Sequence, residues 1–143
     1  MEEPGTKRVY NQAFEGRDDV ILLDVIPIEN GDKLSLIFES KNSNWNQGVW
    51  MKCDKGIAIE DVLSNSVIIW FDKDPDLVSF VCNTENELLS IYNIWDRGIG
   101  INSQSHSSGM LVEDLPNGRR YRCNDIGFET EFDKLIFRIE RTT

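Results

Sequence analysis

The 143-residue sequence has few of the residues that catalytic and metal sites use. It contains one histidine, His106, and three cysteines, Cys53, Cys82 and Cys123, no two of which form a Cys-x-x-Cys pair. Dispersed cysteines with a single histidine exclude a zinc site. An odd number of cysteines without a signal-like N-terminal segment indicates free thiols in a reducing compartment, so we expect a cytoplasmic protein.

Positive charge and long apolar runs are also scarce. Lysine and arginine number 15 against 25 acidic residues, which gives a formal net charge of −10 and a pI near 4.5. Nucleic acids and anionic membranes are bound by cationic surfaces, so this charge excludes both as partners. No apolar run approaches the ~20 residues of a membrane-spanning helix. Solubility explains most of the acidic charge, and the alternative is an acidic face that attracts a basic protein.

Apolar residues are nevertheless sufficient for a folded core. They make up 40% of the sequence and include seven phenylalanines, four tryptophans and three tyrosines, which excludes a disordered chain. A chain of this length fits one core. We therefore predict a single domain over residues 1–143, in which residues 1–5 form a frayed tail.

Three pairs of alternating or β-branched runs flank tight-turn sequences and are predicted as hairpins. They are Val20 to Ile28 with Lys33 to Glu39 around Asn30-Gly31, Gly48 to Cys53 with Ile57 to Val62 around Asp54-Lys55-Gly56, and Gly109 to Glu113 with Arg119 to Cys123 around Pro116-Asn117-Gly118. Asparagine and glycine tolerate the positive φ angles that such turns require.

Four further runs predict strands, at residues 6–14, 66–71, 77–83 and 134–141. The first is expected at a sheet edge. The second is apolar on both faces, as is typical of a strand at the centre of a sheet. The last alternates cleanly, which predicts that Leu135, Phe137 and Ile139 face the core.

The run Leu88 to Trp95 has an apolar spacing that fits either a strand or a helix. Its isoleucine and tyrosine favour extended structure, and Gly98 ends the run after a few turns, so we predict a strand. The total is nine to eleven short strands with little or no helix. This pattern is typical of an all-β sandwich, jelly-roll or barrel, and we predict an antiparallel β-sandwich or jelly-roll.

A long polar loop at residues 96–108 follows this strand and is the best candidate for a binding surface. The candidate binding residues in and around it are Trp45, Asn93, Trp95, Asp96, Arg97, Asn102 and His106. Aromatic rings stack on the C–H face of a sugar while amides and carboxylates bind its hydroxyl groups, and the same mixture suits a protein hot spot. The alternative for Trp95 is packing in the core.

The sequence signals for a catalytic or metal site are weaker than those for a binding surface. His106 is the only base that could activate Cys123, but Cys123 falls on the apolar parity of its strand, where inert thiols lie. The acids from Asp72 to Asp76 resemble the start of a calcium loop but lack its glycine and its final glutamate. We therefore predict no catalytic residue, no metal and no cofactor.

Arg119, Arg120 and Arg122 form the main basic cluster. Strand alternation places Arg120 and Arg122 on a solvent-facing side if the residues between them face inward. We expect these arginines to pair with acids across the turn, Glu113 or Asp114, and an anion site is the alternative.

These patterns predict a non-catalytic, acidic binding protein. The first hypothesis is a protein-binding or inhibitory module of the immunity-protein type, which neutralises a partner with a basic surface. The alternative is a β-sandwich that binds a small polar ligand or a carbohydrate. A remote alternative is a hydrolase that uses Cys123 and His106.

Overall fold

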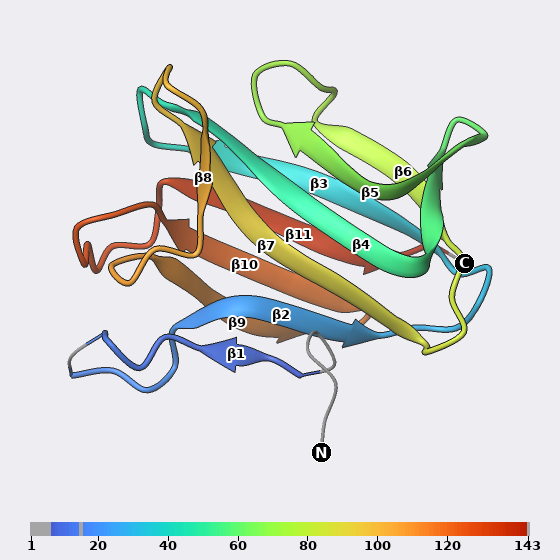
Figure 1. Ribbon diagram of the computed structural model, residues 1–143, viewed down its shortest axis with the longest axis horizontal. Helices are drawn as coiled ribbons and strands as arrows, with labels where there is room; N and C mark the ends of the chain where they lie inside the picture. Colours follow the sequence, from blue (N-terminus) through green and yellow to red (C-terminus); the bar gives the residue numbers. More distant parts are fainter. Residues whose placement is uncertain (1–6, 15, 143) are drawn as a thin grey trace.

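The computed structural model describes residues 7–14 and 16–142, and these residues form eleven strands and no helix (Figure 1). The strands are β1 (Val9–Tyr10), β2 (Ile21–Pro27), β3 (Lys33–Lys41), β4 (Asn46–Ile59), β5 (Val62–Trp70), β6 (Leu77–Cys82), β7 (Leu88–Asp96), β8 (Ile101–Ser103), β9 (Gly109–Leu115), β10 (Gly118–Asn124) and β11 (Leu135–Arg141). The described residues thus contain no helix that could cross a membrane. The predicted frayed tail, residues 1–5, lies outside the described residues.

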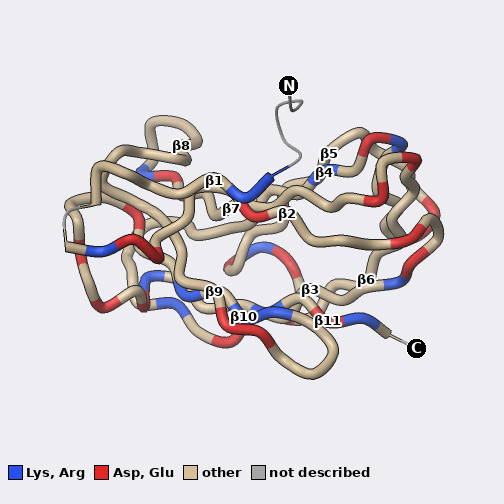
Figure 2. Tube along the Cα trace, turned by 90° about the horizontal axis from the view of Figure 1, so that it is seen from below, with Lys and Arg blue, Asp and Glu red and all other residues tan. Residues whose placement is uncertain are grey.

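Eight of these strands form a closed β-barrel. They pair in the order β2-β9-β10-β11-β3-β6-β4-β7, and β7 pairs back onto β2. The barrel is flattened into two layers, with β2, β4 and β7 in one and β3, β6, β9, β10 and β11 in the other (Figure 2). The all-β prediction is confirmed, but the predicted sandwich or jelly-roll is wrong, because the layers are joined by strand pairing on both sides. Closure leaves fewer unpaired strand edges than two separate sheets would.

The core lies between the two layers and is built from alternating inward side chains. Leu135, Phe137 and Ile139 of β11 are at most 1% exposed, as predicted. The ring of Phe137 stacks on that of Tyr121 from β10, with 5.0 Å between centroids. Burying each such side chain contributes about 1.5–3 kcal/mol to folding.

Two other local predictions are confirmed. Residues 88–96 form strand β7, because this segment pairs with β4 along most of its length and with β2 near its start. β9 and β10 form the third predicted hairpin, in which Leu115 pairs with Gly118 across Pro116 and Asn117.

The first predicted hairpin is wrong, because β2 and β3 do not pair with each other. Asn30 and Gly31 instead carry the chain from one layer to the other. The N–H of Gly31 donates to the carbonyl of Cys82, and the side chain of Asn30 accepts from the N–H of Thr84. The Asn-Gly pattern predicted the turn correctly, but local sequence does not determine which strands pair across it.

The second predicted hairpin is displaced. β4 runs without a break through Asp54-Lys55-Gly56, where its pairing with β5 shifts register. The turn lies at Glu60 and Asp61, whose φ angles are +50° and +66°. Residues 66–70 of the predicted central strand belong to β5, but the central position is wrong, because β5 pairs with β4 alone and Ile68 is 40% exposed.

The turn at Glu60 and Asp61 gives a prediction about stability. Two non-glycine residues with positive φ are strained, whereas Asn-Gly adopts this geometry readily. Replacing Glu60-Asp61 by Asn-Gly should raise the free energy of unfolding by about 1 kcal/mol and the Tm by about 4 °C. Calorimetry would detect this gain, and a Tm equal to or below that of the wild type would contradict the assignment of the strain.

Candidate functional site

The candidate loop is more ordered than its composition indicates. Strand β8 pairs with the end of β7, so residues 94–103 form a small hairpin. The carboxylate of Asp96 accepts hydrogen bonds from the N–H groups of Gly98 and Gly100, at 2.7 and 3.2 Å, and thereby shapes the turn. Asn102 supports the same turn, because its side chain donates to the carbonyl of Gly100.

Two of the candidate residues belong to the interior. Trp95 is 1% exposed and Asn93 is 3% exposed. The side-chain amide of Asn93 donates to the carbonyl of Asn124 at 2.8 Å, which ties β7 to β10. Both side chains face the interior and neither lines the hollow that borders Trp45, so the prediction for these two residues is wrong. For Trp95 the alternative interpretation, packing in the core, is correct.

Trp45 and Arg97 lie side by side. The pairing of Asn46 with Asp96 brings the residue before β4 next to the residue after β7. The guanidinium carbon of Arg97 lies 5.5 Å from the centroid of the Trp45 ring, a cation–π contact. The backbone N–H of Trp45 donates to the hydroxyl of Ser43 at 3.1 Å, which shapes the chain beside the ring. The ring itself is partly exposed, and Arg97 is exposed.

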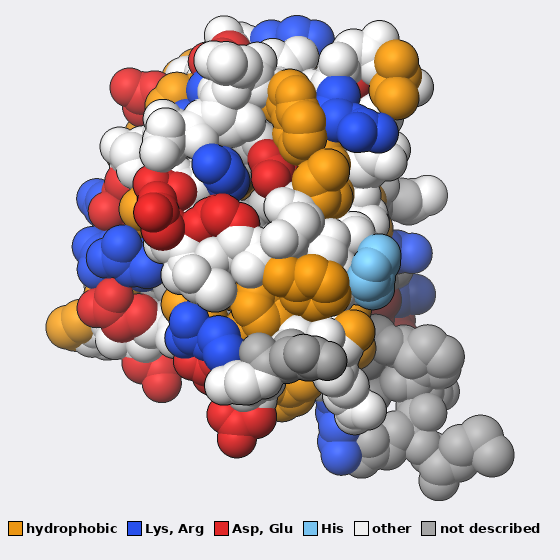
Figure 3. Space-filling view, turned by 90° about the vertical axis from the view of Figure 1, so that its left-hand side faces the viewer, with side chains coloured by type: hydrophobic (Ala, Val, Ile, Leu, Met, Phe, Trp, Pro, Cys, Tyr) orange, Lys and Arg blue, Asp and Glu red, His pale blue; other side chains and the backbone are white. Residues whose placement is uncertain are grey.

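An open hollow of about 610 Å³ borders the Trp45 ring. It is lined by Lys41, Asn42, Ser43, Asn44, Trp45, Asp125 and Lys134, which come from the β3–β4 connection and from both ends of the β10–β11 connection. The lining therefore combines an aromatic ring, two amides, two ammonium groups and a carboxylate. Figure 3 shows that apolar, acidic and basic side chains are mixed on this end of the molecule.

Asp125 is the fixed carboxylate of this hollow. It is 4% exposed, and its Oδ1 accepts from the N–H of Ile126 at 2.8 Å. Its Oδ2 accepts from the side-chain amide of Gln47, which is fully buried, at 3.1 Å. The amide oxygen of Gln47 has no hydrogen-bond partner among the described residues. Sequence analysis missed both residues, and the one available signal was the apolar parity on which Gln47 precedes Val49 and Met51.

His106 lies away from the Trp45 hollow. Its ring is exposed and meets the ring of Phe128 edge-on, with 5.6 Å between centroids. Its carbonyl accepts from the side chain of Asn11 at 2.9 Å. His106 is therefore a surface residue of the neighbouring loop, and it does not line the hollow with Trp45.

Cys123 is fully buried in the core, and this burial raises the pKa of its thiol well above the ordinary value. A buried, protonated thiol cannot act as a nucleophile on a substrate in solvent. The remote hypothesis of a hydrolase that uses Cys123 and His106 is therefore wrong.

Three carboxylates of the β10–β11 connection lie close together. Oxygen atoms of Glu129, Glu131 and Asp133 are all within 4.8 Å of one another, and one oxygen each of Glu129 and Asp133 is buried without a hydrogen-bond partner in the described part of the chain. Asp133 also accepts from the side chain of Asn42 at the hollow, at 2.8 Å. These are the residues that could hold a cation, and oxygen ligands of this kind suit Ca²⁺.

The acids between Asp72 and Asp76 are used within the protein. Asp72 pairs with Lys41, and Asp74 accepts from the backbone N–H of Trp70 at 2.7 Å. They thus help to form an acidic turn between β5 and β6.

The arginine cluster divides between the two faces of β10. Arg120 faces outward and pairs with Glu113, as predicted, and also with Glu39 at 2.8 Å. Arg119 has the inward parity of Tyr121 and Cys123, which sequence analysis did not consider. Its guanidinium contacts Asp24 and Val25 of β2 and Asp114 of β9.

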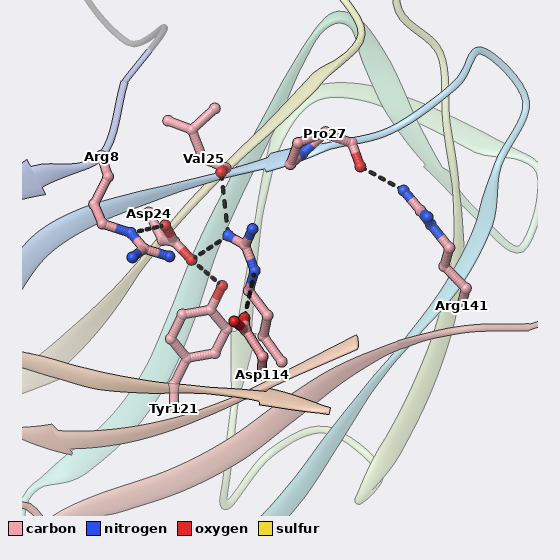
Figure 4. A network of polar contacts seen from close by, with 8 residues as sticks. Arg8, Asp24, Val25, Pro27, Asp114, Tyr121 and Arg141 are labelled. Atoms are coloured by element: carbon pink, nitrogen blue, oxygen red, sulfur yellow. Dashed lines mark hydrogen bonds and ion pairs between the residues drawn. The ribbon is translucent and has the colours of Figure 1, made fainter. Parts of the chain in front are cut away.

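Arg119 belongs to a buried polar network centred on Asp24, which is fully buried (Figure 4). One oxygen of Asp24 accepts from Arg8 at 2.7 Å, and the other accepts from Arg119 at 2.9 Å and from the hydroxyl of Tyr121. Burial by itself raises the pKa of Asp24, but the hydrogen bonds from Arg8 and Tyr121 and the charge of Arg119 outweigh it. The pKa of Asp24 therefore lies below its ordinary value.

Comparison with known proteins gives little guidance. No protein family matches the sequence, and no curated protein is significantly similar to it. Among solved structures, the chain is similar to the lectin CV2L of Chromobacterium violaceum in complex with alpha-methyl-fucoside, with 13% identity, a TM-score of 0.47, and coverage of 83% of this chain and 96% of that one. The chain is also similar to the high-affinity mannose-binding lectin of Ralstonia solanacearum, with 13% identity and a TM-score of 0.43. That match covers 85% of this chain and 96% of the lectin chain. The barrel is defined by its strand pairings and the candidate site by the lining of the Trp45 hollow.

Proposed function

We propose that this protein binds a small polar ligand of the carbohydrate class in the hollow beside Trp45. The observation that carries the proposal is the position of the Trp45 ring, which contacts Arg97 and borders an open hollow lined by amide, ammonium and carboxylate groups. A partly exposed tryptophan in this position offers a flat apolar surface on which a sugar ring can pack.

The lining groups match the hydrogen-bonding needs of a sugar. Each hydroxyl group of a sugar both donates and accepts, and the amides of Asn42 and Asn44 can do the same. Lys41 and Lys134 add donors, and Asp125 adds an acceptor whose position is fixed by Gln47. The C–H face of the sugar ring would pack on Trp45 while its hydroxyl groups meet this polar lining.

The geometry favours this ligand over a basic protein partner. Trp95, a candidate ring of both hypotheses, is buried, so neither a sugar nor a protein partner can use it. The lining of the hollow is also mixed in charge, since Lys41 and Lys134 lie there with Asp125. A site that attracts a basic protein surface would need an excess of carboxylates in this lining.

Replacing Trp45 by alanine should weaken sugar binding about tenfold or more, because the apolar platform is removed. The measurement is isothermal titration calorimetry of the full chain with methyl α-glycosides of the common hexoses and 6-deoxyhexoses. Trp70→Ala is the matched control: this ring is also partly buried and also carries a cation, Lys73, over its face, at 5.8 Å, but it does not line the hollow.

The control variant should bind the same glycoside within about twofold of the wild type. Equal losses in the Trp45 and Trp70 variants would reject the platform role of Trp45. If no glycoside of the panel binds the wild-type chain, the carbohydrate proposal fails.

A further inference from the structure

A second hollow, of about 280 Å³, is lined by residues from the end of β2, the start of β3 and the turn between β9 and β10. In Figure 1 the end of β2 lies at the opposite end of the barrel from the start of β4, which follows Trp45. Its apolar lining consists of Ile26, Pro27, Leu34, Leu115, Pro116 and Ile139. Leu34 and Ile139 are each 1% exposed, so the floor of the hollow is part of the barrel core. The charged residues of the lining are Arg119 and Arg141, and we call this hollow the Arg119–Arg141 pocket.

The pocket exists because the barrel wall is incomplete between β2 and β9. These strands share one residue pair, Ile21 with Met110, and β2 then pairs with β7 as far as Pro27. The side chain of Arg119 spans from β10 to β2, where it donates to Asp24 at 2.9 Å and to the carbonyl of Val25 at 3.3 Å. Because these side-chain hydrogen bonds replace backbone pairing between β2 and β9, the two strands leave a gap in the barrel wall. The mouth of a barrel is a common place for a ligand.

The charge of the lining is unusual for this chain. The sequence has ten more acidic than basic residues, yet the pocket is lined by two arginines and, among the described residues, by no acid. Asp24, Asp114 and Asp32 approach these arginines from outside the lining. Arg141 also donates to the carbonyl of Pro27, which holds its side chain across the mouth (Figure 4). A guanidinium carries five N–H donors, more than these contacts use.

We propose that the Arg119–Arg141 pocket binds a small organic anion that has one carboxylate and an apolar body. The two guanidinium groups complement the carboxylate, because the planar arginine fork matches its two oxygens. The apolar lining complements the body. The volume corresponds to about nine water molecules at ~30 Å³ each, which limits the ligand to the size of a short fatty acid or a small aromatic acid.

Hexanoate is the probe for this proposal, and ¹H–¹⁵N correlation spectra of the full chain provide the readout. Saturable shifts are expected for the amides of Leu115, Asn117, Gly118 and Arg141. Hexan-1-ol, which lacks the carboxylate, and acetate, which lacks the apolar body, should each bind about tenfold more weakly or not at all. Equal binding of hexanoate and hexan-1-ol would overturn the role of the arginines.

Two arginine variants test whether the ligand contacts Arg141 itself or responds only to the net charge of the protein. Arg141→Gln should weaken hexanoate binding about tenfold, whereas Arg122→Gln removes the same charge from the outward face of β10 and should leave binding unchanged. Leu115→Asp, which places a carboxylate in the lining, should abolish binding. Equal effects of the two arginine variants, or hexanoate shifts centred on Trp45, would overturn the proposal. Sugar binding at the Trp45 hollow is tested separately, so either proposal can fail alone.

Discussion

Replacing Asp24 by asparagine is expected to lower the free energy of unfolding by about 3–5 kcal/mol. The carboxylate is fully buried and accepts hydrogen bonds from Arg8, Arg119 and Tyr121. Asparagine is neutral, so the variant leaves Arg119 partly buried beside a group that no longer offsets its charge. The loss should be large because Arg119 also bridges the gap between β2 and β9, where backbone pairing is nearly absent.

The same substitution should change the pH dependence of stability. The pKa of Asp24 is lowered in the folded state, so its contribution is fully present above the unfolded pKa of about 3.9. This contribution is lost as the pH falls through the lower folded pKa. The wild type should therefore lose stability below about pH 4 more steeply than the Asp24→Asn variant.

Urea unfolding at several pH values measures both effects. Asp19→Asn is the control, since Asp19 pairs with Arg17 at 2.9 Å on the surface and should cost less than about 1 kcal/mol. Similar losses in the two variants would show that the buried network around Asp24 stabilises the barrel no more than a surface ion pair does.

Gly118→Ala is the second substitution with a large expected effect. A Cβ atom at Gly118 would lie 1.8 Å from the carbonyl oxygen of Ile139 on the neighbouring strand β11. That oxygen belongs to the backbone, so relief requires β10 and β11 to move apart at a point where Gly118 pairs with Glu140. We expect a cost of about 4 kcal/mol or more, or failure to fold.

Gly127→Ala is the control that separates this clash from the backbone strain of replacing a glycine with positive φ. Gly127 has a φ of +91°, and a Cβ atom added to it would meet no atom within 4 Å beyond its chain neighbours. Its substitution should therefore cost about 1–2 kcal/mol through backbone strain alone. Thermal unfolding of the Gly118→Ala and Gly127→Ala variants measures the loss of stability in each. A Gly118 variant as stable as the Gly127 variant would contradict the tight packing of β10 on β11.

The strands could be predicted from the sequence to the extent that they depend on local patterns. The alternation of Leu135, Phe137 and Ile139 reports directly which face is buried, and Pro116-Asn117 permits the hairpin between β9 and β10. The closure of the barrel could not be predicted, because β2 pairs with β7 and β9 over long sequence separations. Asn30-Gly31 shows the limit of local patterns, since it makes a turn without making a hairpin.

The candidate site likewise combines residues that local sequence identifies with contacts that only long-range strand pairing creates. Composition identified Trp45 and Arg97 separately, but their contact depends on the register that pairs Asn46 with Asp96. Trp95 was predicted at the surface but is buried, because both faces of β7 are buried near its end. The alternation of apolar and polar residues therefore could not show that Trp95 faces the core. Asp125 was missed because it joins the hollow only when the β10–β11 connection folds beside the start of β4.

The central claim, a sugar site beside Trp45, is tested most directly by ¹H–¹⁵N correlation spectra of the full chain titrated with the methyl glycosides. The indole N–H signal of Trp45 and the amide signals of Asn44 and Asp125 should shift and saturate together, while the indole signal of Trp70 stays in place. A glycoside that shifts signals around Arg119 and Arg141 instead, or a panel that shifts none, would contradict the claim.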